Sequence, residues 1–133
     1  MLVSENTSIK TDLAMGLKNQ HNVLSVLRDQ FGDLVETTEK YCKYDFIDSL
    51  GNHYEMKSRR TSKKAYPSTL MPVHKILQTP VRQFFIFKFT DILCYIEYDE
   101  TVFSRFTTGL VTDARQGRDD LHFFIPITAL IDI

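Results

Sequence analysis

Residues 34 to 60 restrict the fold more than any other stretch, because they read as two strands joined by a turn. The sequence LVETTEKYCKYDFIDSLGNHYEMKSRR is rich in Val, Thr, Tyr, Phe and Ile, which favour strands. The interruption DSLGN contains the Asp, Ser, Gly and Asn typical of a chain reversal. This segment therefore predicts an antiparallel pair of strands with a turn at 48–52, in which Asp48 acts as a turn residue.

Successive side chains of a strand point to opposite faces of the sheet. Asp45 therefore shares a face with Ile47 on the first strand, and Glu55 shares a face with Lys57 on the second. The two acids lie on neighbouring strands joined by the turn. The pattern predicts that Asp45 and Glu55 converge, with Lys57 beside them.

The first third of the chain predicts an amphipathic helix that stops at Gly32. Its apolar residues recur at helical spacing: Leu13, Leu17, Leu24, Leu27 and Phe31. Gln20 lies on the same stripe. A buried amide needs hydrogen-bonding partners, so we expect Gln20 to point toward whatever the apolar face covers.

The rest of the chain predicts more strands than helices. We expect a loop over 62–70, a short helix over 71–79, strands on both sides of Thr90-Asp91, a hairpin with its tip at 113–120, and a short turn or strand over 127–133. A chain of 133 residues is long enough for one core only. We therefore expect a single domain over 1–133, of α/β or α+β class with a central sheet.

The charge of the chain is unevenly distributed. The formal net charge is −1, yet residues 56–82 contain seven Lys and Arg residues and no acid. A local basic surface of this kind can face phosphates although the whole protein is nearly neutral. A loop kept solvated by lysines is the alternative explanation.

Features of secretion and membrane insertion are missing from the sequence. The start MLVSENTSIKTDLAMGL has no basic region followed by an apolar stretch, and no apolar run approaches the roughly 18 residues of a membrane span. The two cysteines, Cys42 and Cys94, have no motif spacing and read as reduced thiols. We expect a soluble, intracellular protein without membrane association.

The paired acids and the lysine are suited to phosphodiester hydrolysis. This reaction needs charge neutralisation at phosphorus and a hydroxide-like nucleophile, which Mg²⁺ or Mn²⁺ held by carboxylates can supply. Asp45 and Glu55 are the candidate ligands, and the backbone carbonyl near Met56 is a candidate for a further oxygen ligand. Lys57 could orient or deprotonate the attacking water and stabilise developing negative charge.

The stretch YDFIDSLGNHYEMKSRR resembles the core of the PD-(D/E)XK nuclease superfamily, and its EMKSR part is similar to archaeal Holliday junction resolvases. That family has an Asp opening one strand and a Glu-x-Lys in the next, and Asp45, Glu55 and Lys57 match these places. The proline of the family name is absent, since Tyr44 precedes Asp45. The resemblance covers roughly residues 13 to 98 and implies a restriction-endonuclease-like central mixed sheet flanked by helices.

The resemblance also implies further site residues. A preceding helix contributes an acid or amide to the site, and Gln20 falls at that position in place of the usual Glu. A helix after the Glu-x-Lys strand approaches DNA in the family. Further candidates lie in the acid-free segment 56–82, which we call the basic window. Together the candidates for DNA contacts are Arg59, Arg60, Lys63, Lys64, Lys75 and Gln78.

These observations predict a Mg²⁺- or Mn²⁺-dependent endonuclease that acts on DNA, with a structure-selective, resolvase-like activity as one form of it. A chain of this size is compatible with a homodimer that presents two sites to two strands. Two alternatives stay open. One is a non-catalytic nucleic-acid-binding or assembly module with the same fold, and the other is an unrelated α+β interaction domain in which the acids and lysine are merely exposed.

Overall fold

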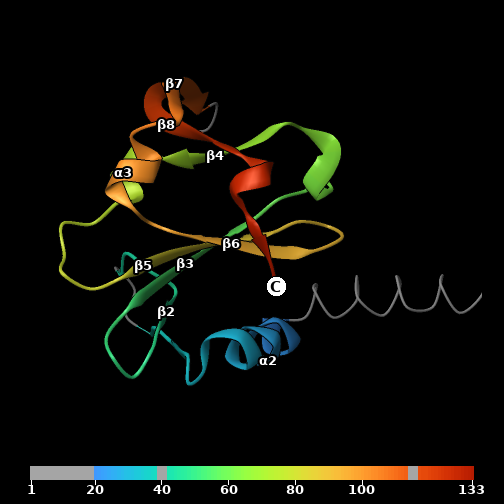
Figure 1. Cartoon of the computed structure of the whole chain (residues 1–133), viewed down its shortest axis with the longest axis vertical. Helices are drawn as coiled ribbons and strands as arrows, with labels where there is room; N and C mark the ends of the chain where they lie inside the picture. The colour runs from blue at the N-terminus through green and yellow to red at the C-terminus, as the bar shows by residue number, and fades with distance from the viewer. Residues whose placement is uncertain (1–19, 39–41, 114–116) are drawn as a thin grey trace, which may run out of the picture.

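The computed structural model describes residues 20–38, 42–113 and 117–133. In this part the chain forms two β-sheets and few helices, so the class is mixed α and β with mostly sheet (Figure 1). The helices are α2 (Gln20–Phe31) and α3 (Glu100–Phe103), with 3₁₀ turns η1 (Lys63–Ala65), η2 (Val73–Lys75) and η3 (Ile127–Ala129).

The central sheet has six strands and mixed direction. In spatial order they are β1 (Val35–Glu36), β2 (Phe46–Ile47), β3 (His53–Ser58), β5 (Gln83–Lys88), β6 (Leu93–Glu97) and β9 (Ile131–Asp132). The pair β3 and β5 is parallel, and the other neighbours are antiparallel. The predicted central mixed sheet is therefore present, with β3 near its middle.

The second sheet has three antiparallel strands in the order β4, β8, β7. Their bounds are β4 (Ser68–Pro72), β7 (Thr107–Asp113) and β8 (Arg118–Pro126). In Figure 1 this sheet lies on one side of the central sheet and α2 lies on the other. The central sheet is thus covered on both faces, by unlike layers.

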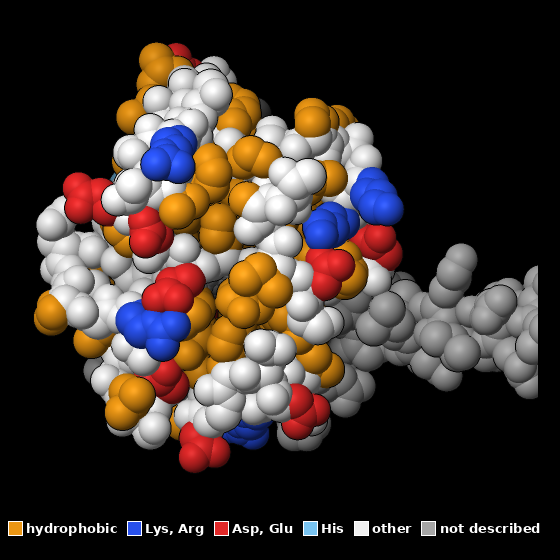
Figure 2. Space-filling view, viewed as in Figure 1, with side chains coloured by type: hydrophobic (Ala, Val, Ile, Leu, Met, Phe, Trp, Pro, Cys, Tyr) orange, Lys and Arg blue, Asp and Glu red, His pale blue; other side chains and the backbone are white. Residues whose placement is uncertain are grey.

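Strand β5 carries apolar side chains on both faces of the central sheet, and this requires both faces to be covered. All of its side chains from Gln83 to Phe87 are buried, which is typical of a strand with no solvent face. Phe84 and Ile86 pack with α2, whereas Phe85 and Phe87 pack with the second sheet. Figure 2 shows hydrophobic side chains that reach the surface between α2 and the three-stranded sheet, where the edge of the central sheet lies.

The turn between β2 and β3 is held by one side chain. Asp48 Oδ1 accepts hydrogen bonds from the backbone amides of Leu50 and Asn52, both at 2.9 Å. Its Oδ2 accepts from Asn52 Nδ2 at 3.0 Å and from the Tyr54 hydroxyl at 2.8 Å. Gly51, at φ +84°, supplies the left-handed conformation that the reversal requires. The prediction that Asp48 is a turn residue is confirmed.

Local patterns predicted several elements. The helix that stops at Gly32, the hairpin around Thr90-Asp91, the strand pair β7–β8 and the strand near the C-terminus are confirmed, although residues 13–19 and 114–116 lie outside the described part. Cys42 and Cys94 are free thiols.

The predictions for 62–70 and 71–79 were partly wrong. Residues 68–72 form strand β4 instead of a loop and the start of a helix, and only Val73–Lys75 are helical, as a 3₁₀ turn. The reason is a distant partner, because β4 pairs along its length with β8 and buries Thr69 and Met71. The face of the central sheet opposite α2 is therefore covered mainly by strands, with Phe103 of α3 added to that core.

Candidate active site

Asp45 lies directly before β2 and is tied to β3. Its backbone amide donates to the Tyr54 carbonyl at 2.9 Å, and its Oδ2 accepts a hydrogen bond from the Met56 amide at 2.8 Å. The side chain thus continues the β2–β3 pairing where the backbone pairing ends. Because the N–H and C=O of one strand residue point to the same side, the Met56 carbonyl also faces the Asp45 side of β3.

Glu55 is the centre of a cluster of opposite charges. Its Oε1 lies 3.5 Å from Lys57 Nζ and 3.3 Å from Lys75 Nζ. The side chains are largely enclosed, with exposed fractions of 12% for Glu55, 22% for Lys57 and 28% for Lys75. Lys75 arrives from η2, which is far from β3 in the sequence, so the cluster depends on the tertiary fold.

Burial shifts the pKa values of Glu55 and Lys57 in this cluster. Burial and the negative charge of Asp45 raise the pKa of Glu55, against the opposing effects of Lys75 and Lys57. Burial and the neighbouring Lys75 ammonium lower the pKa of Lys57, against the opposing effect of Glu55. Each charged form is therefore less favoured here than in water. An additional divalent cation between the two carboxylates would relieve the repulsion that raises the pKa of Glu55.

The donors in this region are suited to a hard divalent cation. Asp45 and Glu55 supply carboxylate oxygens, and the Met56 carbonyl faces the same edge of β3 as Asp45. No group of three or more His, Cys, Asp or Glu side chains is placed to hold a metal within residues 20–38, 42–113 and 117–133. Two carboxylates and a carbonyl nevertheless match Mg²⁺, which keeps several of its waters when it binds proteins.

Gln20 begins α2, and its side chain lies outside the described residues. The helix that carries it packs on the face of the central sheet formed by Tyr54 and Phe84. Glu55 and Lys57 alternate with Tyr54 along β3 and so occupy the opposite face. The role of Gln20 in the site stays a prediction.

Arg59, a predicted DNA contact, is occupied within the protein. Its Nε donates to Thr69 Oγ1 at 3.0 Å, and its Nη2 donates to the Leu70 carbonyl. Its guanidinium also lies over the Phe87 ring, 5.5 Å from the ring centroid. Burial lowers the pKa of Arg59. These contacts attach the chain after β3 to strand β4, so the structure gives Arg59 a stabilising role that the sequence did not indicate.

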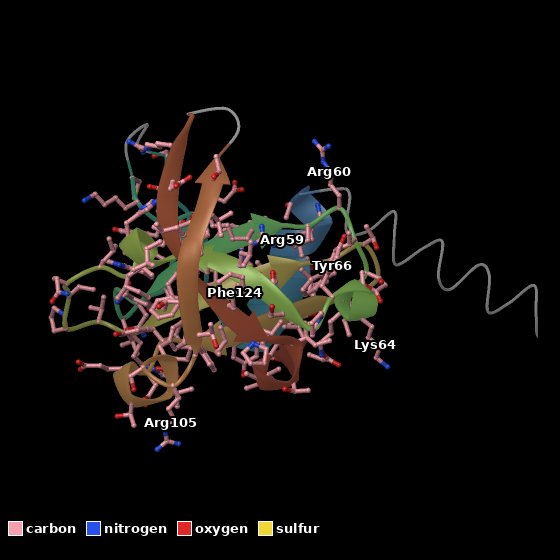
Figure 3. All side chains as sticks on the ribbon, turned by 90° about the horizontal axis from the view of Figure 1, so that it is seen from above. Arg59, Arg60, Lys64, Tyr66, Arg105 and Phe124 are labelled. Atoms are coloured by element: carbon pink, nitrogen blue, oxygen red, sulfur yellow. The ribbon has the colours of Figure 1, made fainter. Side chains whose placement is uncertain are left out.

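The other predicted DNA contacts divide into two groups. Lys63 forms a salt bridge with Asp132, and Lys75 is paired with Glu55. Arg60, Lys64 and Gln78 are exposed. Figure 3 shows Arg60 and Lys64 extending away from the body of the molecule. Gln78 lines a separate hollow of about 390 Å³ together with Arg82 and Glu97.

A groove of about 650 Å³ begins beside Lys57, and sequence reasoning missed its aromatic residues. It is bounded by residues from the basic window and by side chains of β4 and β8, among them Arg60, Tyr66, Leu70, His122 and Phe124. Lys57 and His122 also line a second hollow of about 450 Å³ that reaches Lys75 and Arg118. Tyr66 inside the acid-free basic window was a signal, whereas nothing local marked Phe124.

Among the described residues, no helix is both long and apolar enough to cross a membrane. In comparisons with known proteins, no family model matches the chain, and neither the curated proteins nor the solved structures give a match. The function is therefore inferred from the chain's own residues.

Proposed function

We propose that this chain is a metal-dependent endonuclease that hydrolyses DNA phosphodiester bonds, with a restriction-endonuclease-like domain of the PD-(D/E)XK type. The observation that carries the proposal is the cluster on one face of β3. Lys57 Nζ lies 3.5 Å from the Glu55 carboxylate, and the charge of Asp45 raises the pKa of that same carboxylate. Two interacting acids and a lysine are the groups that this chemistry uses.

Asp45 and Glu55 would hold Mg²⁺ or Mn²⁺, with the Met56 carbonyl as a third oxygen ligand. Asp45 supports this assignment, because its negative charge raises the pKa of Glu55, and a cation between the two carboxylates would relieve that repulsion. When bound, the cation would neutralise charge on the phosphate and lower the pKa of a coordinated water.

In this proposal Lys57 acts on the nucleophile. Burial and Lys75 lower its pKa, which increases the fraction of neutral amine that can accept a proton from water. In hydrolysis the water oxygen bonds to phosphorus, the bond from phosphorus to the leaving deoxyribose oxygen breaks, and that oxygen gains a proton from solvent. As an ammonium, Lys57 would stabilise the negative charge that develops on the phosphate.

The finer parts of the proposal concern substrate and assembly. DNA is the proposed partner. In the structure-selective form of the proposal, the enzyme prefers branched DNA, as a resolvase does. Exposed Arg60 and Lys64 are the proposed phosphate contacts of the basic window. A homodimer would present two sites to two strands, and an intracellular location fits a DNA substrate.

The test is single-turnover cleavage of labelled junction, flap, mismatched and plain duplex DNA with Mg²⁺, Mn²⁺ or EDTA. We expect metal-dependent cleavage of at least one form, lost in Asp45→Asn and Glu55→Gln. Arg105→Ala is the control, because Arg105 is exposed and extends from another side of the molecule (Figure 3). Wild-type protein that cleaves none of these DNA forms would overturn the proposal.

A second candidate function is nucleic-acid binding without cleavage. It is favoured by one observation, since Glu55 already has two ammonium partners and its charge is balanced without a metal. In that case Asp45→Asn and Glu55→Gln should leave DNA binding unchanged in EDTA and in Mg²⁺. Binding that tightens with Mg²⁺ in wild type only would favour the nuclease.

A further inference from the structure

The groove beside Lys57 combines positive charge with exposed aromatic surface. Of its lining residues four are cations, namely Lys57, Arg59, Arg60 and Lys63, and none is acidic. Since Arg59 and Lys63 are engaged within the protein, Arg60 is the lining cation most open to a ligand. This charge pattern is complementary to a polyanion.

Three of the described Phe and Tyr residues line the groove, and two of them, Tyr66 and Phe124, are not fully buried and come from different parts of the chain. Tyr66 follows η1 and is 63% exposed, so its ring is accessible to a ligand in the groove. Phe124 comes from β8 and is half-buried. In Figure 3, Arg60 and Lys64 extend from the side of the molecule on which Tyr66 lies, whereas Arg105 extends elsewhere.

The size of the groove limits what it can hold. A volume of about 650 Å³ lies within the range of sites for small organic ligands, roughly 300–1,000 Å³, so one or two nucleotides would fit but a duplex would not enter. Paired bases are stacked inside a duplex and expose no face to a side chain, whereas an unpaired base can stack on an aromatic ring.

We propose that this groove binds an unpaired nucleotide of a DNA strand, with its base stacked on Tyr66, with an adjacent phosphate held by Arg60, and with Lys64 contacting the strand outside the groove. The inference rests on the proposed nuclease function, because Lys57 lines the groove and also belongs to the charged cluster around Glu55. It assigns the substrate class: DNA with a single-stranded segment next to the scissile bond, rather than continuous duplex.

The test measures binding of a labelled oligo-dT strand and of a plain duplex of the same length by fluorescence anisotropy in EDTA. Tyr66→Ala should weaken binding of the single strand by about tenfold, and Tyr66→Phe should retain it. Arg60→Ala and Lys64→Ala should each lower the slope of log affinity against log salt by about one. Arg105→Ala should leave both quantities unchanged.

Three outcomes would overturn the inference: equal affinity of wild type for duplex and single strand, unchanged affinity of Tyr66→Ala, or an acidic peptide that competes as well as the oligonucleotide. Because Tyr66 is mostly exposed, its replacement should not unfold the protein, and a melting curve of each variant verifies this.

The same variants separate this inference from the nuclease proposal. If wild type binds single strands through Tyr66 but cleaves no DNA, the binding of an unpaired nucleotide in the groove is supported, whereas the nuclease proposal and the substrate assignment that rests on it fail. If wild type cleaves plain duplex and Tyr66→Ala cleaves it equally well, the nuclease proposal stands and the groove inference fails.

Discussion

The carboxylate of Asp45 accepts a hydrogen bond from the backbone amide of Met56 at 2.8 Å, across a separation of 11 residues. This bond fixes Asp45 against the middle of β3, one residue from Glu55. It uses Oδ2, and none of the residues that the structure describes donates a hydrogen bond to Oδ1. The two roles of Asp45, support of the strand pair and charge in the site, can therefore be separated by substitution.

Asp45→Asn keeps an oxygen that can accept from Met56 and removes the charge, whereas Asp45→Ala removes both. We expect Asp45→Asn to retain the fold and to lose metal-dependent cleavage. Asp45→Ala should in addition reduce the free energy of unfolding by about 1 kcal/mol, the usual contribution of such a bond. Urea unfolding and single-turnover cleavage measure the two effects. Equal cleavage by Asp45→Asn and wild type would remove Asp45 from the site.

Lys57→Ala should lower the single-turnover cleavage rate by about 10²-fold or more and leave DNA binding nearly intact, because the lysine acts on the nucleophile and transition state. Lys64→Ala is the matched control on the basic surface. It should weaken DNA binding at every salt concentration tested, with less effect on the rate at saturating enzyme. Wild-type rates for Lys57→Ala at saturating enzyme would contradict the assigned role.

The raised pKa of Glu55 predicts a pH dependence of stability. Burial and the charge of Asp45 raise this pKa above its ordinary value of 4.5. The folded protein then binds more protons than the unfolded chain, so the contribution of Glu55 to stability decreases as pH rises from about 4.5 through the raised value. Glu55→Gln lacks this contribution.

The Tm of Glu55→Gln minus that of wild type should therefore become more positive between about pH 4 and pH 7 in the absence of divalent cations. Thermal unfolding at several pH values measures this difference. A difference in Tm that stays constant over the range, or changes in the opposite direction, would show that the protein does not raise the pKa of Glu55.

The contacts of Arg59 predict that this residue stabilises the fold, although the sequence predicted it to be a DNA contact. Arg59→Ala leaves the Thr69 hydroxyl and the Leu70 carbonyl without their donor. We expect a loss of about 1.5–3 kcal/mol in the free energy of unfolding, as for hydrogen bonds to charged groups. Arg59→Lys should also destabilise, because an ammonium cannot reproduce the fork of donors. Arg105→Ala, by contrast, should change stability by no more than about 0.5 kcal/mol.

Strand pairs with a local signal could be predicted from the sequence. The turn residues at 48–52 and the alternation around them define β2 and β3, whereas β5 and β6 are indicated by runs of aromatic and β-branched residues on both sides of Thr90-Asp91. Strand β4 could not be predicted this way. Pro67 precedes it and Pro72 ends it, and both prolines favour a loop or helix start. Its partner β8 is at least 50 residues away in the sequence, since Pro72 pairs with His122. A tertiary pairing overrides the local preference there.

The candidate site divides in the same way. Period two along β3 places Glu55 and Lys57 on one face, and both can be found from the sequence. Lys75 as a partner of Glu55, and the enclosure of Arg59 by β4, follow only from the packing of the second sheet. The groove was hidden for the same reason, because Tyr66 and Phe124 come from segments that are brought together by the fold.

The most direct measurement is a crystal of the wild-type protein soaked in Mn²⁺, with diffraction data collected to reveal anomalous scattering. We predict an anomalous difference peak between the carboxylates of Asp45 and Glu55, within coordination distance of the Met56 carbonyl, and no such peak in crystals of Asp45→Asn. Mn²⁺ absent from this position in a well-ordered wild-type crystal, with Glu55 still paired to Lys57 and Lys75, would contradict the proposed metal-dependent nuclease.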